Sequence, residues 1–572
     1  MLHSRRLAVI AFALLVAAAA LAAMMLFRPE QRAKGVGEQR FYVRITHEGC
    51  AGNFQLYPDP LTKRNFFRRG ELAAFEFEVS NPNDSDLKVE LLLAPLDKPQ
   101  QLLKVGEGAA PARRVTRLWF EVDTASLEPA LYRAALRVVG VGEFDSNTEP
   151  FRRTNLDSYP WLLAVLDEPV RWEAPEGGLP RLIVPEGLGV NIHFIAPSPF
   201  ELRDLDMIAY AGFKLIRMDL FWSTVERERG AYDFSGYDAL TSALKERGLR
   251  PLYILCYGNP LYDGGQPPRS EEARSAYASY AGAAASRYGA YALWEVWNEP
   301  NIDVFWKPQP SAPDYARLLA AASRAIKESC PSCLVLAPAT SGVDVEFVRA
   351  LAVRGALELV DAVSVHPYRG GPPETVLTDY ERLRSVVGDK TIICSEWGYT
   401  TGGAYANRVD VVTQAHYSLR IYLTNLMAGV PLTIIYDWKD DGLSLADSEH
   451  NFGLVAHHVR GPEWFFIKPA YYAIYNFNRE LADYAPKEGR ALGEGAYLLV
   501  LQRGEEMRLV VWTSGPARTV KLSLGSQRAL VIRTFGLREV VEAIGGELEL
   551  EVDRGTGNRS PPKGLKGGAP LQ

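Results

Sequence analysis

The sequence predicts an α/β fold, in which a (β/α)₈ TIM barrel stands between an N-terminal β-sandwich and a small C-terminal β-sandwich. Three patterns predict it. Early runs alternate apolar and polar residues, a middle region alternates apolar runs with helical spacing, and alternating runs return near the end. With 572 residues, the chain is also too long for one hydrophobic core, so we expect several domains.

The first 35 residues contain a long apolar segment. Residues 7–27 include no charged side chain and would span about 30 Å as a helix, close to the thickness of a bilayer's hydrocarbon core. This length favours an uncleaved membrane anchor, with a removed signal peptide cut near Ala20-Leu21-Ala22 as the alternative. In either case we expect the body of the protein outside the cytoplasmic membrane, in the periplasm or the extracellular space.

Residues 36–174 are predicted to form an Ig-like β-sandwich. Runs such as Phe75-x-Phe77-x-Val79 have the period-2 alternation of half-buried strands, and turn sequences such as Asn81-Pro82-Asn83-Asp84 separate them. No aromatic stripe stands out here, which favours a spacer or packing role over sugar binding. Residues 175–186 are interpreted as a linker.

Residues 187–485 are predicted to form the barrel. Apolar strands are expected to start near residues 188, 215, 250, 292, 333, 362, 391 and 431, and each gap between them can hold a helix. Eight such units are typical of a (β/α)₈ barrel. A doubly wound open sheet is the alternative, but no glycine-rich phosphate turn follows the first strand, so the barrel is favoured.

Period-2 runs return in residues 486–553, which we predict to be a small β-domain, and residues 554–572 lack apolar residues to bury and are expected to be disordered. The net charge of −6 provides no basic surface for nucleic acid, so no nucleic-acid partner is expected. Five cysteines exclude a disulfide scaffold; Cys330 and Cys333 form either a small disulfide or two free thiols.

Functional side chains of TIM barrels lie at the carboxyl ends of the strands. Glu299 ends the apolar run of the fourth strand and Glu396 lies at the end of the seventh, so we expect the two carboxylates to converge to about 5 Å across the mouth. Such a pair suits glycosidic bond cleavage, provided that Arg217 keeps one acid ionised and apolar surroundings keep the other protonated.

The strand ends together resemble those of clan A retaining glycoside hydrolases. The resemblance rests on residues 297–300 (WNEP), His366-x-Tyr368, residues 395–398 (SEWG) and Trp438, and residues 436–455 followed by 468–471 are similar to families 39 and 5. It covers residues 187–485 and the trailing β-domain. It implies a retaining double displacement, with Glu299 as general acid/base and Glu396 as nucleophile.

The same resemblance implies the substrate contacts. Asn298 would bond the sugar 2-hydroxyl, Arg217 and Tyr368 would orient Glu396, His366 would line the acid/base side, and Trp438 would form the floor under the sugar. His193 and Trp222 either line a subsite or pack in the core. The residues Asp437, Asp440 and Asp441 and the run Glu226–Arg229 are expected to be solvated loops, and neither a metal ion nor a cofactor is predicted.

The leading hypothesis is therefore an endo-acting retaining glycosidase on a β-linked polysaccharide, similar to bacterial exopolysaccharide endoglycosidases. An exo-acting β-glycosidase on oligosaccharides is one alternative. The other is a non-catalytic carbohydrate-binding or scaffold protein, against which the presence of both glutamates argues. The expected partners are a polysaccharide or oligosaccharide substrate and, if the leading helix is uncleaved, the membrane.

Overall fold

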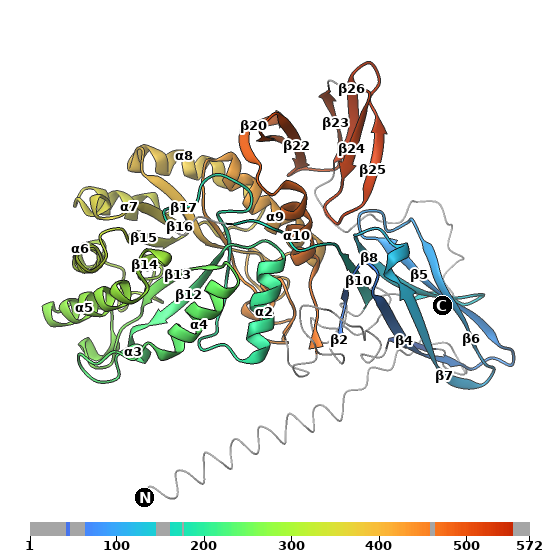
Figure 1. The fold of residues 1–572 in the computed structure, drawn as a ribbon, viewed down its shortest axis with the longest axis horizontal. Helices are drawn as coiled ribbons and strands as arrows, with labels where there is room; N and C mark the ends of the chain where they lie inside the picture. Colours follow the sequence, from blue (N-terminus) through green and yellow to red (C-terminus); the bar gives the residue numbers. More distant parts are fainter. Residues whose placement is uncertain are drawn as a thin grey trace, which may run out of the picture.

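The computed structural model describes residues 42–45, 63–144, 161–173, 177–457, 464–524 and 526–552. The apolar segment 7–27, Cys50, part of the predicted linker and the tail 554–572 lie outside these ranges. No helix within them is long and apolar enough to cross a membrane. A barrel ringed by helices lies beside a β-sandwich, with a group of small sheets next to both (Figure 1).

The barrel confirms the predicted fold class. Its eight parallel strands close on themselves, because the last strand pairs with both the first and the seventh. They begin within two residues of the predicted starts: β11 (Leu188–Asn191), β12 (Leu215–Phe221), β13 (Arg250–Cys256), β14 (Leu293–Val296), β15 (Leu334–Ser341), β16 (Ala362–His366), β17 (Thr391–Trp397) and β18 (Thr433–Ile435). Aliphatic side chains such as Leu215, Ile254 and Ile393 fill the interior, so the barrel is a packed core and not a pore.

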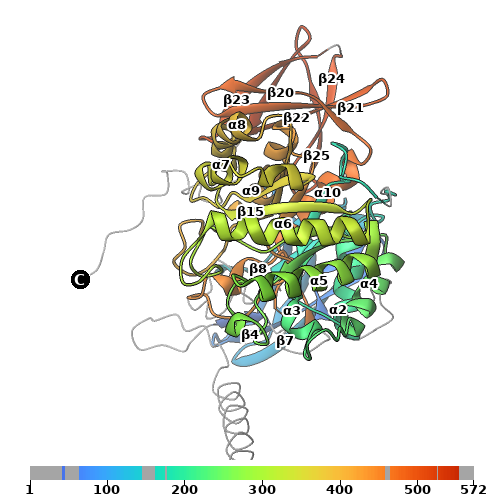
Figure 2. The same ribbon diagram turned by 90° about the vertical axis from the view of Figure 1, so that its left-hand side faces the viewer.

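Helices follow the strands and cover the outside of the barrel, as Figure 2 shows for α5 and α6. Several begin at capping side chains; Ser198 and Glu201, for instance, form a reciprocal capping box at the start of α2. The helices are α2 (Pro199–Tyr210), α3 (Trp222–Val225), α4 (Ser235–Glu246), α5 (Glu271–Tyr288), α6 (Ala312–Ser329), α7 (Val345–Ala352), α8 (Val376–Val387), α9 (Val411–Met427) and α10 (Pro469–Leu481). Cys330 and Cys333, after α6, form a disulfide.

The N-terminal strands form two facing sheets around a core of alternating apolar residues that includes Phe75, Phe77 and Trp161. One sheet has the order β1 (Tyr42–Ile45), β4 (Leu72–Asn81), β7 (Arg114–Asp123). The other has the order β3 (Phe66–Arg68), β10 (Leu162–Leu166), β8 (Leu131–Val138), β5 (Leu87–Pro95), β6 (Leu103–Ala110), with β9 (Gly142–Phe144) paired to β8.

The C-terminal strands form three small sheets, of which the first, within residues 485–513, lies next to α8 and α9 in both views (Figures 1 and 2). The buried pair of Glu374 and Arg420 fixes this contact, because Trp512 Nε1 donates to Glu374 at 2.6 Å. The sheets are β20 (Ala485–Gly493), β21 (Ala496–Arg503) and β22 (Glu506–Thr513); β23 (Arg518–Ser523) and β26 (Glu547–Val552); β24 (Arg528–Ile532) and β25 (Arg538–Glu542).

The sandwich is bonded directly to the barrel. Strand β2 (Lys63–Arg64) pairs with β19 (Trp464–Phe465), which follows the eighth barrel strand. Beside it, the Asn65 side chain donates to the carbonyl of Ile467 and accepts from its N–H, both at 2.9 Å. The chain that leaves the barrel mouth after β18 is thus held by residues that precede the barrel by more than a hundred positions.

Candidate active site

Arg217 on β12 is the centre of the polar network in the barrel mouth. Its guanidinium is 1% exposed and donates to Glu295 Oε2 at 2.8 Å and to Asn298 Oδ1 at 2.7 Å. It also donates to Glu396 Oε2. A buried arginine with five donors can hold several acceptors in one plane, so this side chain sets the positions of β14 and β17 groups together.

Glu396 lies at the end of β17 and receives two donors. Arg217 bonds one carboxylate oxygen, and the hydroxyl of Tyr368 donates to the other at 2.9 Å. Burial alone would raise the pKa of Glu396, but the charges of His366 and Arg217 and the bond from Tyr368 hold it below its usual value. This carboxylate is therefore ionised at neutral pH, as a nucleophile must be.

Glu299 follows β14 and is 7% exposed. Its Oε1 lies 2.9 Å from His366 Nδ1, and the other ring nitrogen of His366 lies 3.1 Å from Ser395 Oγ. One carboxylate oxygen from each of Glu299 and Glu396 and a ring nitrogen of His366 all lie within 4.8 Å of one another. The two acids that the sequence places almost a hundred residues apart therefore meet as expected.

The backbone departs from strand geometry after β14, where it carries Glu299, and the chain that leaves β17 comes very close to the end of β18. Trp297 and Glu299 have φ values of 69° and 46°, and the Glu299 N–H donates to Ala339 O at 2.9 Å. A Cβ on Gly398 would lie 1.9 Å from the carbonyl oxygen of Tyr436, so only glycine lets the chain after β17 approach the end of β18 so closely.

The prediction that Trp438 forms the surface under the bound sugar is wrong. Trp438 is 1% exposed and packs edge-on against Tyr471 of α10. The aromatic residue that faces the mouth is Tyr436, whose partly exposed ring lies 5.7 Å from the ring of His193 and 6.4 Å from that of Tyr368.

Trp222 also does not reach the mouth, so its place among candidate substrate contacts is corrected. It is fully buried and stacks on Tyr262 at 5.1 Å between ring centroids. Its Nε1 donates to Glu226 Oε2 at 2.5 Å, and Tyr262 donates to the other oxygen at 2.7 Å. Glu226, which was expected to lie in a solvated loop, is 1% exposed, because it satisfies donors inside the core.

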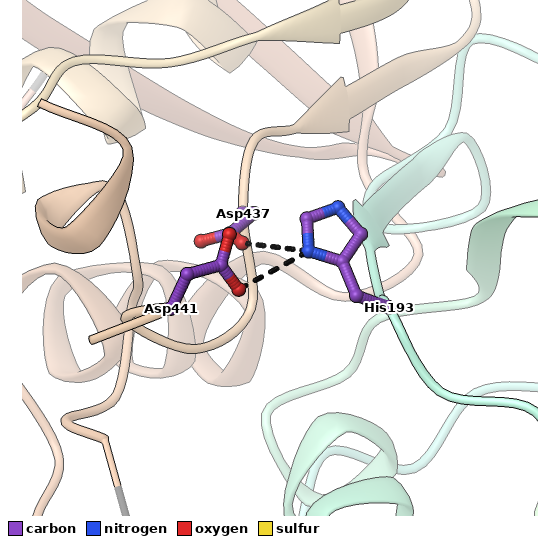
Figure 3. A group of neighbouring side chains, drawn as sticks. All are labelled: His193, Asp437 and Asp441. Atoms are coloured by element: carbon purple, nitrogen blue, oxygen red, sulfur yellow. Dashed lines mark hydrogen bonds and ion pairs between the residues drawn. The ribbon is translucent and has the colours of Figure 1, made fainter. Parts of the chain in front are cut away.

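His193, Asp437 and Asp441 converge at the rim of the mouth and are named the rim cluster below (Figure 3). His193 follows β11, and its Nδ1 lies 3.2 Å from Asp441 Oδ1 and 3.7 Å from Asp437 Oδ2. Asp437 is 2% exposed and Asp440 is fully buried and paired with Lys468, so these two acids are not the solvated loop residues that were expected.

The sequence reasoning missed Glu295 as well. This carboxylate is fully buried in the middle of β14 and binds Arg217. A lone acid inside an apolar strand was the available signal, because a buried charge requires a partner. Ser395 and Tyr436 lie in segments on which the family resemblance rests, but neither was given a role, since both residue types are common in strands and at strand ends.

No protein-family model matches the sequence, and no curated protein matches it. Among solved structures, a family 39 glycoside hydrolase from the gut symbiont Bacteroides cellulosilyticus WH2 is similar, with a TM-score of 0.60 and 22% identity over 83% of this chain and 95% of that chain. A family 39 β-xylosidase from Caulobacter crescentus has a TM-score of 0.46 and 21% identity over 63% and 83%. The first of these two similarities shows that the chain shares the fold of a family 39 glycoside hydrolase.

Proposed function

We propose that this chain is a retaining glycoside hydrolase that cleaves β-linked glycans. The observation that carries the proposal is the pair of Glu299 and Glu396, whose carboxylate oxygens lie within 4.8 Å at the barrel mouth. Retaining enzymes hold their carboxyl groups about 5 Å apart, whereas inverting enzymes need about 6.5–9.5 Å to admit a water molecule. The short separation supports double displacement, and the shared fold agrees with it.

In the first step, ionised Glu396 attacks the anomeric carbon while Glu299 gives its proton to the glycosidic oxygen. The C–O bond to the leaving sugar breaks, and an ester joins Glu396 to the glycone. In the second step, Glu299 takes a proton from water, the resulting hydroxide oxygen attacks the anomeric carbon, and Glu396 leaves as a carboxylate. Configuration is retained because each step inverts it once.

The surrounding residues support these steps. Arg217 and Tyr368 hold Glu396 ionised and in place, and Asn298, bonded to Arg217, is positioned to contact the sugar 2-hydroxyl. His366 holds the Glu299 side chain. Tyr436 takes the position under the sugar that the sequence reasoning gave to Trp438, since its ring borders the mouth and that of Trp438 does not.

A panel of 2-fluoro glycosides tests the mechanism, because these reagents accumulate the glycosyl-enzyme. The expected result is one labelled peptide that carries the sugar on Glu396, and label on any other residue contradicts the assignment. Turnover of β-glycans by the wild type, by Glu396→Ala and by Glu346→Gln completes the test. The last variant changes an exposed acid of α7 and is expected to retain full activity.

We further propose endo action on a polysaccharide outside the cytoplasmic membrane. The apolar residues 7–27 support this location, since such a segment directs or anchors a chain to the membrane. The product-length profile distinguishes the modes: an endo enzyme releases a spread of oligosaccharides early, whereas an exo enzyme releases only one small product. Fractionation of cells that express the full chain tests the location.

A further inference from the structure

The rim cluster has more hydrogen-bond acceptors than donors. The only donor it contributes is the imidazole of His193, while Asp437 and Asp441 offer four carboxylate oxygens. Asp437 Oδ1 is buried and has no hydrogen-bond partner among the described residues. A buried, unpaired carboxylate oxygen is costly, so a positive charge brought beside Asp437 would stabilise its carboxylate.

The protonation of His193 follows from its neighbour Asn191. Asn191 Oδ1 accepts from Arg217 at 3.4 Å, so its Nδ2 faces His193 Nε2 at 2.9 Å. Nε2 is then an acceptor, and the ring proton lies on Nδ1, facing both aspartates. Burial opposes a charge on the ring, yet the bond to Asp441 and the charges of both aspartates raise the pKa of His193 to about 9. A second proton requires the Asn191 amide to turn, and even then one imidazolium faces two acids.

Further acids are crowded around the rim cluster. Asp219 on β12 lies close enough for its charge to interact with His193 and Glu396. Burial raises the pKa of Glu449, and the charges of Glu396 and Asp441 add to this, while the hydroxyls of Tyr405 and Tyr436 are its hydrogen-bond partners among the described residues. Burial likewise raises the pKa of Asp437 well above its usual value, and the charges of Asp441 and Asp440 add to this. An anionic sugar at this rim would raise these pKa values further, whereas a cationic one would lower them and stabilise the ionised carboxylates, so a cation is the favoured ligand.

We propose that the rim cluster binds the protonated amine of an amino sugar, so that the glycan cleaved here carries free amino groups rather than acetamido or carboxylate groups. An ammonium brings three donors and one positive charge, which match the excess of acceptor oxygens in the cluster and would hold its aspartates ionised. A divalent metal ion fits less well, because Nδ1 of His193 carries a proton in either charge state and has no lone pair to offer.

The cluster lies within reach of the sugar that Glu396 attacks. His193 connects through Asn191 to Arg217, which bonds Glu396, and the ring of Tyr436 spans the space between His193 and Tyr368. The amine would thus be on the glycone, on the side of Arg217 opposite Asn298. This inference rests on the proposed hydrolase function and specifies its substrate class.

The kinetic test uses 4-nitrophenyl β-glycosides of glucosamine and galactosamine, their N-acetyl forms and the neutral parent sugars. We expect kcat/KM for the amine to exceed that for the N-acetyl form by about tenfold. Asp441→Asn should lower kcat/KM for the amine about tenfold more than for the N-acetyl form. Asp303→Asn removes an exposed acid from the loop after β14 and should leave the ratio unchanged.

Equal kcat/KM for amine and N-acetyl substrates, or a ratio that Asp441→Asn does not change, overturns the proposal while hydrolysis itself stands. If no glycoside is cleaved, the amine site is tested by measuring oligosaccharide binding. Calorimetry on Glu299→Gln compares fully deacetylated and fully acetylated β-1,4-linked hexasaccharides, in EDTA and then with Ca²⁺, Mn²⁺ or Zn²⁺. Tighter binding of the deacetylated chain in EDTA supports the amine site. Equal binding, no binding, or a preference that needs the metal overturns it.

Discussion

Replacing Tyr368 by phenylalanine isolates the contribution of one hydroxyl to the charge state of Glu396. The hydroxyl donates to the carboxylate at 2.9 Å in a mostly buried site. A hydrogen bond to a charged group contributes about 1.5–3 kcal/mol, and one pKa unit corresponds to about 1.4 kcal/mol, so losing the bond should raise the pKa of Glu396 by about one to two units.

The sign follows from the role of the group. The pKa of Glu396 is depressed in the folded protein, so activity is present above that pKa and is lost as the pH falls through it. In Tyr368→Phe the acidic limb of the kcat/KM–pH profile should therefore move to higher pH by about one to two units. The assay is the profile of kcat/KM from pH 3 to 9 on an activated aryl glycoside.

Tyr315→Phe is the matched control. Its buried hydroxyl donates to the carbonyl of Val296 at 2.7 Å, so the variant loses a hydrogen bond of similar length that does not involve a carboxylate. Both variants should lose thermal stability, but only Tyr368→Phe should shift the acidic limb. If the limb stays in place in Tyr368→Phe, or shifts equally in both variants, the proposed control of the Glu396 charge by Tyr368 is refuted.

Three further outcomes follow from the site. Glu299→Ala should lower kcat about 10²–10⁴-fold on glycosides with poor leaving groups, and azide should restore turnover of activated ones with a β-glycosyl azide as product, detected by NMR; an α-azide would contradict retention. Arg217→Met should lower the unfolding free energy by about 3–5 kcal/mol, because Glu295 is left buried and unpaired. In urea titrations, the double variant with Glu295→Gln should recover this stability, but it should not recover activity. Trp222→Phe should lower the melting temperature without changing KM, and Tyr436→Ala should lower kcat/KM about tenfold; the reverse pattern would restore Trp222 as a substrate contact.

The barrel strands could be predicted because parallel strands are buried on both faces and appear as continuous apolar runs. The two acids could be predicted because a (β/α)₈ topology collects strand ends at one face. The predictions that failed concern residues that follow the ends of the strands. After Ile435 the chain leaves extended geometry, so alternation no longer tells which aromatic residue faces the mouth, and Tyr436 takes the position expected for Trp438.

The burial of charged side chains was the second feature that the sequence did not predict. Glu226 lies in a run of four charged residues that is typical of solvated loops, yet it follows Trp222 by four positions, the spacing that brings side chains together on a helix. Asp437 and Asp440 likewise gave no sign of burial, because only the folded loop shows that Lys468 and His193 lie beside them.

The two hydrogen bonds between Asn65 and Ile467 have a consequence for how the domains of this protein can evolve. Ile467 precedes Lys468, which bonds Asp440, the neighbour of a rim aspartate. Asn65, which precedes the barrel, therefore helps to hold the loop after β18 that borders the barrel mouth. A gene fusion that exchanged the sandwich for an unrelated domain would leave the backbone N–H and C=O of Ile467 without their Asn65 partner. The sandwich and the barrel should therefore have evolved together.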